Sequence, residues 1–348
     1  MSGTSAELLQ RARAGDREAF TALVQPHRGE LQVHCYRMLG SVQDAEDAVQ
    51  DTLLSAWVGL SGFEGRSSIR TWLYRIATNQ CLSALRSSAR RPPTVAAERP
   101  GEVLWLQPYP DLMLDDLPDH VPGPDARYES REAVSLAFVT AVQLLPPNQR
   151  AVLLLRDVLG YRAAETADLL GLSEDAVTSA LRRARATIDA SRTRDLPPPA
   201  GGPQERELVD RFVAAFTAPD VDALITLMTD DVWLRMPPQP FEYHGTDAVR
   251  RFLTTIDAHR RSIARMVPTR ANHQPGWGEY VHDPVTGSLH LTGILVAGLA
   301  GDRISALTHF ETTLAPHFAL PRTLRPSERG DPRPAVGTAV GDRDRYGR

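Results

Sequence analysis

The sequence predicts a multidomain protein in which two all-α domains precede one α+β domain. The chain has 348 residues, which exceeds one typical domain and suits two or three. Residues 5–90, and again residues 131–192, repeat apolar residues at helical spacing. After residue 204, helical patterns are followed by glycine-bounded runs of strand-like pattern, without regular alternation of strands and helices. These observations indicate helical domains first and a mixed domain last.

The composition restricts the class of protein. A formal net charge of −4 argues against a uniformly basic nucleic-acid coat, so any DNA-binding surface must be local. Two cysteines, Cys35 and Cys81, without a CxxC pair fit a reduced, cytoplasmic compartment. The N-terminal residues lack an apolar signal segment, and no apolar run is long enough to span a membrane. We therefore expect neither secretion nor a membrane partner.

The first all-α domain, residues 5–90, contains an acidic segment, "DAEDAVQDTLLSAW", at residues 44–57. Asp44, Asp47 and Asp51 have the spacing i, i+3 and i+7, which puts them on one helix face, with Gln50 beside them. Such carboxylates and amides can take charge-assisted hydrogen bonds from arginines of a partner. A solvated charged face is the alternative interpretation.

A basic and aromatic segment, "RSSIRTWLYRIATNQCLSALR", follows at residues 66–86. Bases that leave a duplex need aromatic faces to stack on and polar groups that read their edges. Asn79 lies one helical turn beyond Arg75 and has a suitable amide. The alternative is that Trp72 is a core residue, since it shares its spacing with Ile69 and Ile76. Taken alone, this segment favours the core interpretation.

Proline-rich stretches separate the domains. Residues 91–130 and residues 193–203 read as linkers, and residues 326–348 as a disordered tail.

The second all-α domain, residues 131–192, contains a helix-turn-helix pattern. A first helix over 163–170 ends at Gly171, because glycine accepts the left-handed backbone of a tight turn. Ser173 is placed to cap the next helix. Short polar side chains and arginines on that helix suit a major groove. The alternative is a plain helical hairpin with a solvated arginine face.

Three pieces in this order resemble the extracytoplasmic-function (ECF) sigma factors of the sigma-70 family. They are "DAEDAVQDTLLSAW", "FEGRSSIRTWLYRIATNQCLSALR" and "LPPNQRAVLLLRDVLGYRAAETADLLGLSEDAVTSALRRARATI". The first two resemble region 2 of that family, and the third resembles region 4. Arg162 departs from the pattern, because many members have a serine there that caps the first helix of the motif.

The resemblance implies three groups of binding residues. The group for a coiled coil on the largest catalytic subunit of core RNA polymerase comprises Asp44, Glu46, Asp47, Gln50 and Asp51. The group for the minus-ten element of promoter DNA comprises Phe63, Arg66, Arg70, Trp72, Tyr74, Arg75, Asn79 and Arg86. The group for the minus-thirty-five element comprises Ser173, Thr178, Ser179, Arg182, Arg183 and Arg185.

Residues 204–325 resemble a SnoaL-like domain, an α+β cone related to ketosteroid isomerases. The pieces are "VDRFVAAFTAPDVDALITLMTDDVWLRMPP", "HGTDAVRRFL" and "LAGDRISALTHFE". Aromatic side chains are expected to line the cone around a small ligand, namely Trp233, Phe241, Trp277 and Phe310. Isomerase-type relatives have a carboxylate before a proline after the "DD" turn, where this chain has Met236 and Pro237.

We therefore expect no catalysis in this domain. Asp230 and Asp231 lie in the turn itself. The remaining candidates are lone histidines, which are usually structural: His244, His273, His290 and His309. No cofactor is expected, and no metal, because His27, His34 and Cys35 lack zinc-type spacing.

The sequence thus predicts an alternative sigma factor that directs promoter-specific initiation, with a C-terminal domain that regulates it in cis. Core RNA polymerase and promoter DNA are the expected partners. An anti-sigma factor and a small ligand are further partners that the resemblance allows without identifying them. The alternative is a polymerase-independent DNA-binding regulator, or a small-molecule sensor or enzyme built on the SnoaL-like domain.

Overall fold

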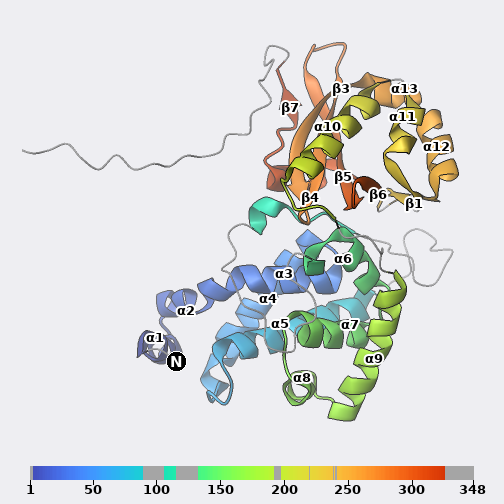
Figure 1. The fold of residues 1–348 in the computed structure, drawn as a ribbon. Helices are drawn as coiled ribbons and strands as arrows, with labels where there is room; N and C mark the ends of the chain where they lie inside the picture. The colour runs from blue at the N-terminus through green and yellow to red at the C-terminus, as the bar shows by residue number, and fades with distance from the viewer. Residues whose placement is uncertain are drawn as a thin grey trace, which may run out of the picture.

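The computed structural model describes residues 3–88, 106–114, 132–191, 197–218, 220–237, 239 and 241–325. Within these residues a helical half and a half built on a β-sheet lie against each other (Figure 1). The predicted order of two all-α domains and one α+β domain is confirmed. The predicted tail at 326–348 and much of the predicted linker at 91–130 lie outside the described residues.

The first helices pack into one bundle. They are α1 (Gly3–Arg13), α2 (Arg17–Val24), α3 (Arg28–Leu39), α4 (Val42–Gly59) and α5 (Ile69–Ser88), with short 3₁₀ turns η1 (Gln25–His27) and η2 (Leu60–Gly62). Gly40, at φ 75°, ends α3 in the left-handed conformation, and Ser41 then caps α4 by accepting a bond from Asp44 N at 3.1 Å. This sharp corner sets α4 back against α3.

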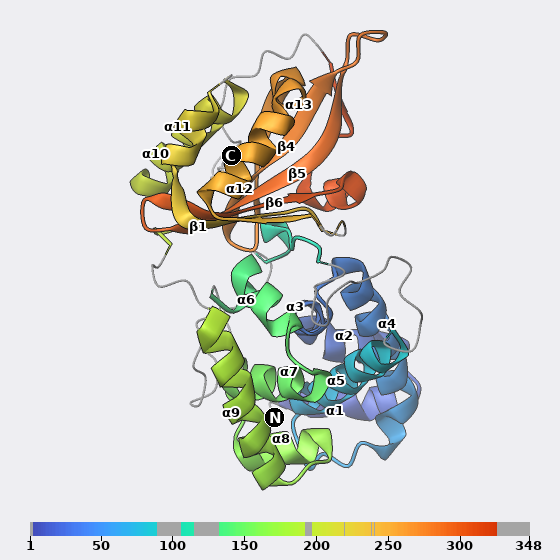
Figure 2. The same ribbon diagram turned by 90° about the vertical axis from the view of Figure 1, so that its right-hand side faces the viewer.

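The second group of helices packs directly on this bundle (Figure 2). It comprises η4 (Glu132–Val134), α6 (Leu136–Gln143), α7 (Pro147–Leu153), a π-helical turn η5 (Leu154–Val158), α8 (Ala163–Leu170) and α9 (Glu174–Ser191). Arg150 of α7 is buried and donates from Nη1 to the Met38 carbonyl at 2.5 Å. Burial lowers the pKa of Arg150 to about 10. The two helical groups therefore share one hydrophobic core.

The C-terminal half is a twisted sheet with helices on one face (Figure 2). Its elements are α10 (Pro203–Thr217), α11 (Val221–Thr226), β1 (Met228–Arg235), β2 (Glu242–His244), α12 (Thr246–Thr255), α13 (Asp257–Ser262), β3 (Ile263–Ala271), β4 (Gln274–His282), β5 (Leu289–Ala300), β6 (Arg303–Phe310), η6 (Thr312–Phe318) and β7 (Thr323–Leu324). The strand order is β2-β1-β6-β5-β4-β3, with β7 paired to β5 and only β1–β6 parallel among the described pairs.

Both faces of the sheet are covered along the second part of β5, where successive side chains point to opposite faces and every residue from Gly293 to Ala300 is buried. On β5, Leu295 and Ala297 face the domain's own helices, where Phe212 of α10 packs against Trp277. Ile294 and Val296 belong instead to the hydrophobic core shared with the helical half, as do residues of η6. The sheet therefore serves as a wall between two cores.

The turn between β3 and β4 projects from the sheet toward the helical half. Asn272 and His273 connect the paired residues Ala271 and Gln274, and both have positive φ, 56° and 59°. This is the conformation of a two-residue type I′ hairpin, which asparagine accepts more readily than most residues. Asn272 is nevertheless buried, since it reaches between segments of the helical half.

Candidate functional site

The acidic face of α4 is exposed along the helix. Asp44, Asp47, Gln50 and Asp51 point to solvent, while Ala45 on the opposite side is fully buried. The start of this helix is capped twice, by Ser41 and by Gln107, whose Oε1 accepts from Val42 N at 2.8 Å. Ser41 and Gln107 together fix the start of the helix that carries this face.

Two exposed apolar residues extend this face and were missed in the sequence. Leu54 is 65 % exposed and Val58 is 80 % exposed. Leu54 lies three residues after Asp51, and Val58 lies seven after it, so both belong to the same side of the helix. Their helical spacing from Asp51 is the feature of the sequence that could have placed them on this face. Together, the four acidic or amide residues and these two form what we call the α4 face.

Glu46 differs from the other predicted residues of α4. It is half-buried, and its Oε1 lies 3.5 Å from Nε2 of His317 in η6. The C-terminal half thus covers the edge of the α4 face.

The basic helix α5 exposes part of the predicted minus-ten group. Arg66, Arg75, Asn79 and Arg86 are exposed. Arg70 is half-buried and donates from Nε to Glu30 at 2.8 Å. The exposed residues can reach a ligand that approaches this helix.

Two aromatic residues of that group require a correction. Tyr74 is buried, and its hydroxyl donates to Glu30 Oε2 at 3.3 Å. Phe63 is also buried, with its ring centroid 4.9 Å from that of Trp72. A flipped base needs an open ring face, so neither Tyr74 nor Phe63 offers one in this structure. Trp72 is half-buried and keeps part of its side chain at the surface.

The helix-turn-helix is formed by α8 and α9. Gly171 has φ 65° and ends α8, and Ser173 Oγ accepts from Ala176 N at 3.2 Å, which caps α9 as predicted. The start of α8, where Arg162 departs from the usual serine, is capped by Glu165, which accepts from the Arg162 amide at 2.7 Å. On α9 the exposed residues are Thr178, Arg182 and Arg183, with Ser179 partly exposed.

Arg185 is the second correction. Its Nε and Nη2 donate to the carboxylate of Asp157 in η5, at 2.8 and 2.6 Å. Asp157 is fully buried. Arg185 therefore holds α9 on η5, and in this structure Asp157 occupies two nitrogens of the guanidinium that was expected to face DNA.

The four predicted pocket residues of the cone do not converge, which is the third correction. Trp277 is buried against Phe212, whereas Phe310 is buried in the core shared with the helical half. Phe241 is 50 % exposed, and Trp233 stacks on His244 with ring centroids 4.3 Å apart. The aromatic side chains therefore fill the domain or lie on its surface.

The remaining polar candidates of this half pair locally. Nε2 of His309 lies 3.3 Å from Glu279 Oε2, and Nε2 of His290 lies 3.3 Å from Asp283 Oδ2. Asp230 and Asp231 were expected in a turn; the structure places both in strand β1, where their side chains are exposed. Within the described part of the chain no group of three or more His, Cys, Asp or Glu side chains could hold a metal ion.

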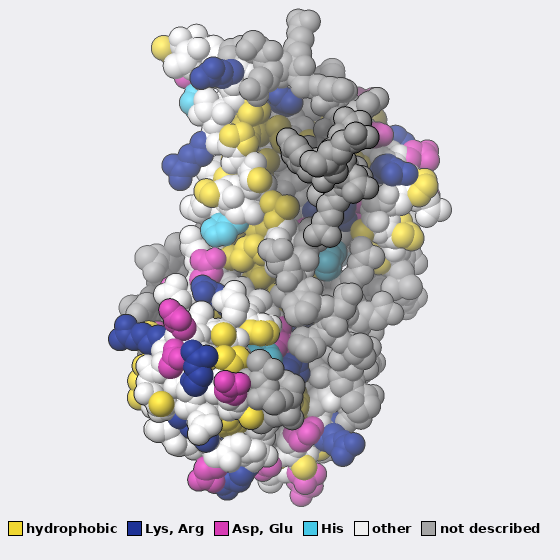
Figure 3. Space-filling view, turned by 90° about the vertical axis from the view of Figure 1, so that its left-hand side faces the viewer, with side chains coloured by type: hydrophobic (Ala, Val, Ile, Leu, Met, Phe, Trp, Pro, Cys, Tyr) yellow, Lys and Arg dark blue, Asp and Glu magenta, His cyan; other side chains and the backbone are white. Residues whose placement is uncertain are grey.

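The surfaces described so far are local patches. Figure 3 shows Lys and Arg side chains interspersed with Asp and Glu over the helical half on the face that it displays. None of the helices in the described ranges has the length and apolar character needed to cross a membrane.

Comparison with known proteins identifies the family. Family models match residues 23–91 as sigma-70 region 2, residues 135–188 as sigma-70 region 4, and residues 209–306 as a SnoaL-like domain. The ECF RNA polymerase sigma factor SigG of Mycobacterium tuberculosis is 43 % identical over 328 residues, which cover 90 % of this chain and 86 % of the relative. The chain belongs to the ECF sigma factors.

Further relatives agree with this assignment. SigM of Mycobacterium tuberculosis, another ECF sigma factor, is 32 % identical over 185 residues, or 53 % of this chain and 83 % of the relative. The crystal structure of the Mycobacterium tuberculosis ECF sigma factor SigJ has the same fold, with a TM-score of 0.57 at 23 % identity over 82 % of this chain and 94 % of that chain. In this ECF sigma factor, region 2 contains the α4 face and α5, region 4 contains the helix-turn-helix, and the SnoaL-like domain is the sheet half.

Proposed function

We propose that this ECF sigma factor binds core RNA polymerase through the α4 face. The observation that supports this most is the continuous exposure of Asp47, Asp51, Leu54 and Val58 on one side of α4. Acidic side chains beside exposed apolar ones suit a protein partner, because the charges steer its approach and the apolar residues give contact area. This surface has the wrong sign of charge for DNA.

Promoter DNA is the second partner that we propose. In region 2, the residues available for the minus-ten element are Arg66, Arg70, Trp72, Arg75, Asn79 and Arg86. In region 4, those available for the minus-thirty-five element are Ser173, Thr178, Ser179, Arg182 and Arg183. Arginines can contact phosphates and base edges, while the asparagine and the hydroxyls supply short-range hydrogen bonds.

The SnoaL-like domain, in our proposal, regulates the sigma domains in cis and is not an enzyme. It packs on the helical half through a shared core, and its η6 contacts Glu46 at the edge of the α4 face. Its inner aromatic side chains pack on one another, as Phe212 does on Trp277, which favours a role through packing over one through a small ligand. Such a factor would work in the cytoplasm, where RNA polymerase is. An anti-sigma factor is a further protein partner that we propose.

Transcription with the full-length chain tests the first part. We expect run-off transcripts from specific promoters only when both this chain and core polymerase are present. In a gel shift, the chain alone should bind promoter DNA feebly, and the complex with core polymerase should bind it tightly. Tight, sequence-specific binding without polymerase would instead support a conventional DNA-binding regulator.

A separable SnoaL-like domain tests the second part. A protease site inserted between residues 192 and 196 would allow the domain to be cut from the folded chain. Cis regulation predicts that promoter output differs before and after cleavage. Identical output at every promoter, with the fragments apart, would contradict it.

A further inference from the structure

The segment of residues 106–114, which we call the strap, lies between region 2 and the SnoaL-like domain. It was predicted as part of a linker, yet Leu106, Gln107, Tyr109 and Leu114 are buried. The strap contains a short turn, η3 (Asp111–Met113), and Pro110 forms a β-bridge with Ala271 at the end of β3. Each side of the strap makes specific hydrogen bonds.

On the region 2 side, Gln107 closes the start of α4. Its Oε1 accepts from the amides of Val42 and Gln43, at 2.8 and 3.2 Å, and from Ser41 Oγ at 3.1 Å. The backbone amide of Gln107 donates to the Gly40 carbonyl at 2.8 Å. The first amides of a helix have no partner within the helix, so Gln107 supplies one for the helix that carries the α4 face.

On the other side, Asn272 of the β3–β4 turn holds the strap. Its Oδ1 accepts from Tyr109 N, and its backbone amide donates to the Tyr109 carbonyl, both at 2.8 Å. Its Nδ2 donates to Tyr36 Oη of α3 at 3.0 Å and to the Val134 carbonyl of η4 at 2.6 Å. One buried side chain therefore joins the strap, region 2 and the segment that leads into region 4.

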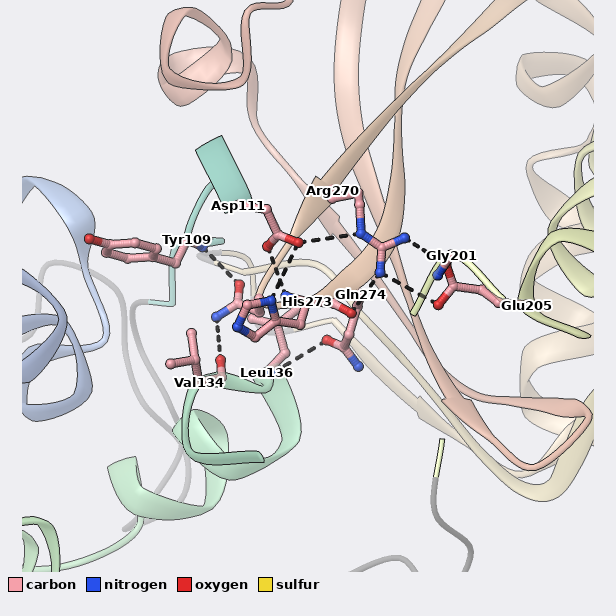
Figure 4. Close-up of polar contacts among 10 residues, drawn as sticks. Tyr109, Asp111, Val134, Leu136, Gly201, Glu205, Arg270, His273 and Gln274 are labelled. Carbon is pink, nitrogen blue, oxygen red and sulfur yellow. Dashed lines mark hydrogen bonds and ion pairs between the residues drawn. The ribbon is translucent and has the colours of Figure 1, made fainter. Parts of the chain in front are cut away.

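Charged groups support the same turn (Figure 4). The His273 amide donates to Asp111 Oδ1 of the strap at 2.8 Å, and Arg270 Nε lies 3.4 Å from Asp111 Oδ2. Arg270 also pairs with the buried Glu205 of α10 at 2.6 Å. These contacts orient the turn, whose two residues, Asn272 and His273, both have positive φ.

We propose that Asn272 is a clamp that keeps the strap across the start of α4 and holds regions 2 and 4 closed until polymerase binds. This inference rests on the proposed function, since it states how the SnoaL-like domain would regulate in cis. Tyr36 links the two ends of the network, because its hydroxyl accepts from Asn272 and donates to the Gln107 carbonyl at 2.8 Å. Hydrogen bonds that share the same buried residues, here Tyr36 and Asn272, are expected to break together. The clamp therefore has a closed state, in which these bonds are made, and an open state, in which they are broken.

The test uses the full-length chain with Asn272→Gly. Glycine tolerates the positive φ of this position, so the substitution removes the side-chain bonds without straining the turn. Losing three buried hydrogen bonds should raise the opening constant of the strap roughly tenfold or more. Hydrogen exchange measures it at the amides of Gln107 and Val42, neither of which is a partner of Asn272. Both amides should exchange faster by that factor.

Core polymerase provides the second readout. If the closed state must open before polymerase binds, the apparent Kd of Asn272→Gly should fall by up to the same factor. The matched control is Val285→Ala at the tip of the β4–β5 hairpin, a residue 90 % exposed and away from the strap. Its exchange and its Kd should equal those of the wild type.

Several outcomes would overturn the clamp. Unchanged exchange at Gln107 and Val42 in folded Asn272→Gly would show that the turn does not hold the strap. Faster exchange with an unchanged Kd would show that the strap does not control polymerase binding. Should Asn272→Gly fail to fold, Tyr36→Phe gives the same test, because it removes only the hydroxyl that both ends share. Hydrogen exchange is measured without polymerase. If the wild-type chain failed to bind core polymerase, the proposed function would be refuted, while the exchange rates would still show whether Asn272 holds the strap.

Discussion

Arg185 of α9 donates two hydrogen bonds, at 2.8 and 2.6 Å, to the carboxylate of Asp157, which is fully buried. Asp157 lies in η5, so this pair attaches the helix that we propose for promoter DNA to the body of region 4. Arg183, two residues earlier on the same helix, is exposed. The two arginines therefore have different roles.

Arg185→Ala should destabilise the protein. It would leave the buried Asp157 carboxylate without this partner, and we expect a loss of roughly 2–4 kcal/mol in the free energy of unfolding, less than for a fully buried pair because Arg185 is partly exposed. Urea unfolding followed by circular dichroism measures this loss. A stability equal to that of the wild type would contradict the structural role.

Arg183→Ala is expected to change DNA binding alone. An exposed arginine of a recognition helix contributes to the contact with base edges or phosphates, so the complex with core polymerase should bind promoter DNA more weakly, by about 1–3 kcal/mol. Its urea midpoint and its affinity for core polymerase should match those of the wild type. Unaltered promoter affinity would remove Arg183 from the minus-thirty-five surface.

Asp51→Arg reverses a charge at the centre of the α4 face. Like charges placed against a partner's arginines repel them, so we expect core polymerase binding to weaken by roughly 100-fold or more. Fluorescence anisotropy with labelled core enzyme measures the Kd. Asp210→Arg, an identical change at an exposed site on α10, is the control and should have no effect. Retained binding by Asp51→Arg would count against this face.

Leu54→Ser tests the apolar part of the same face. Because Leu54 is 65 % exposed, its removal should change the free energy of unfolding by no more than about 0.5 kcal/mol. If the side chain is buried at the interface with polymerase, binding should weaken roughly tenfold or more. A loss of stability in place of affinity would assign Leu54 to the fold of the chain.

His34 predicts a pH dependence of stability. It is buried, bonded to Thr78 Oγ1 at 2.9 Å, and burial lowers its pKa from 6.5 to about 3. Between these two values the unfolded chain binds a proton that the folded chain does not, so stability falls as the pH falls through this window. The slope is at most about 1.4 kcal/mol per pH unit. His34→Gln should keep the bond to Thr78 and remove this share of the slope in urea titrations from about pH 7 to about pH 5.

Much of the helical half could be predicted because its signals are local. Apolar spacing predicted the helices, and Gly171 and Ser173 marked the turn and cap of the helix-turn-helix, which the structure confirms. The exposure of the acidic side of α4 follows from the same periodicity. Each of these properties depends on residues within one or two helical turns.

The corrections concern residues whose partners are distant in sequence. Tyr74 is buried because it meets Glu30 of α3, and Arg185 is engaged by Asp157 of another element. Phe310 faces the shared core because alternation along β6 turns it away from the helices of its own domain. A count of aromatic or basic residues in one segment cannot distinguish such a buried side chain from an exposed one.

The sequence by itself determined the domain order, the helices of regions 2 and 4, and the separation of an acidic face from a basic one, because periodicity and charge are properties of short segments. Only the tertiary structure decided which side chains remain exposed and how the SnoaL-like domain meets the sigma domains. Asn272 illustrates the difference. In the sequence it is one residue of a turn, yet in the fold it joins Tyr36, Tyr109 and Val134, which lie far apart along the chain. A buried amide must find partners for its polar atoms, and the fold places those partners around it.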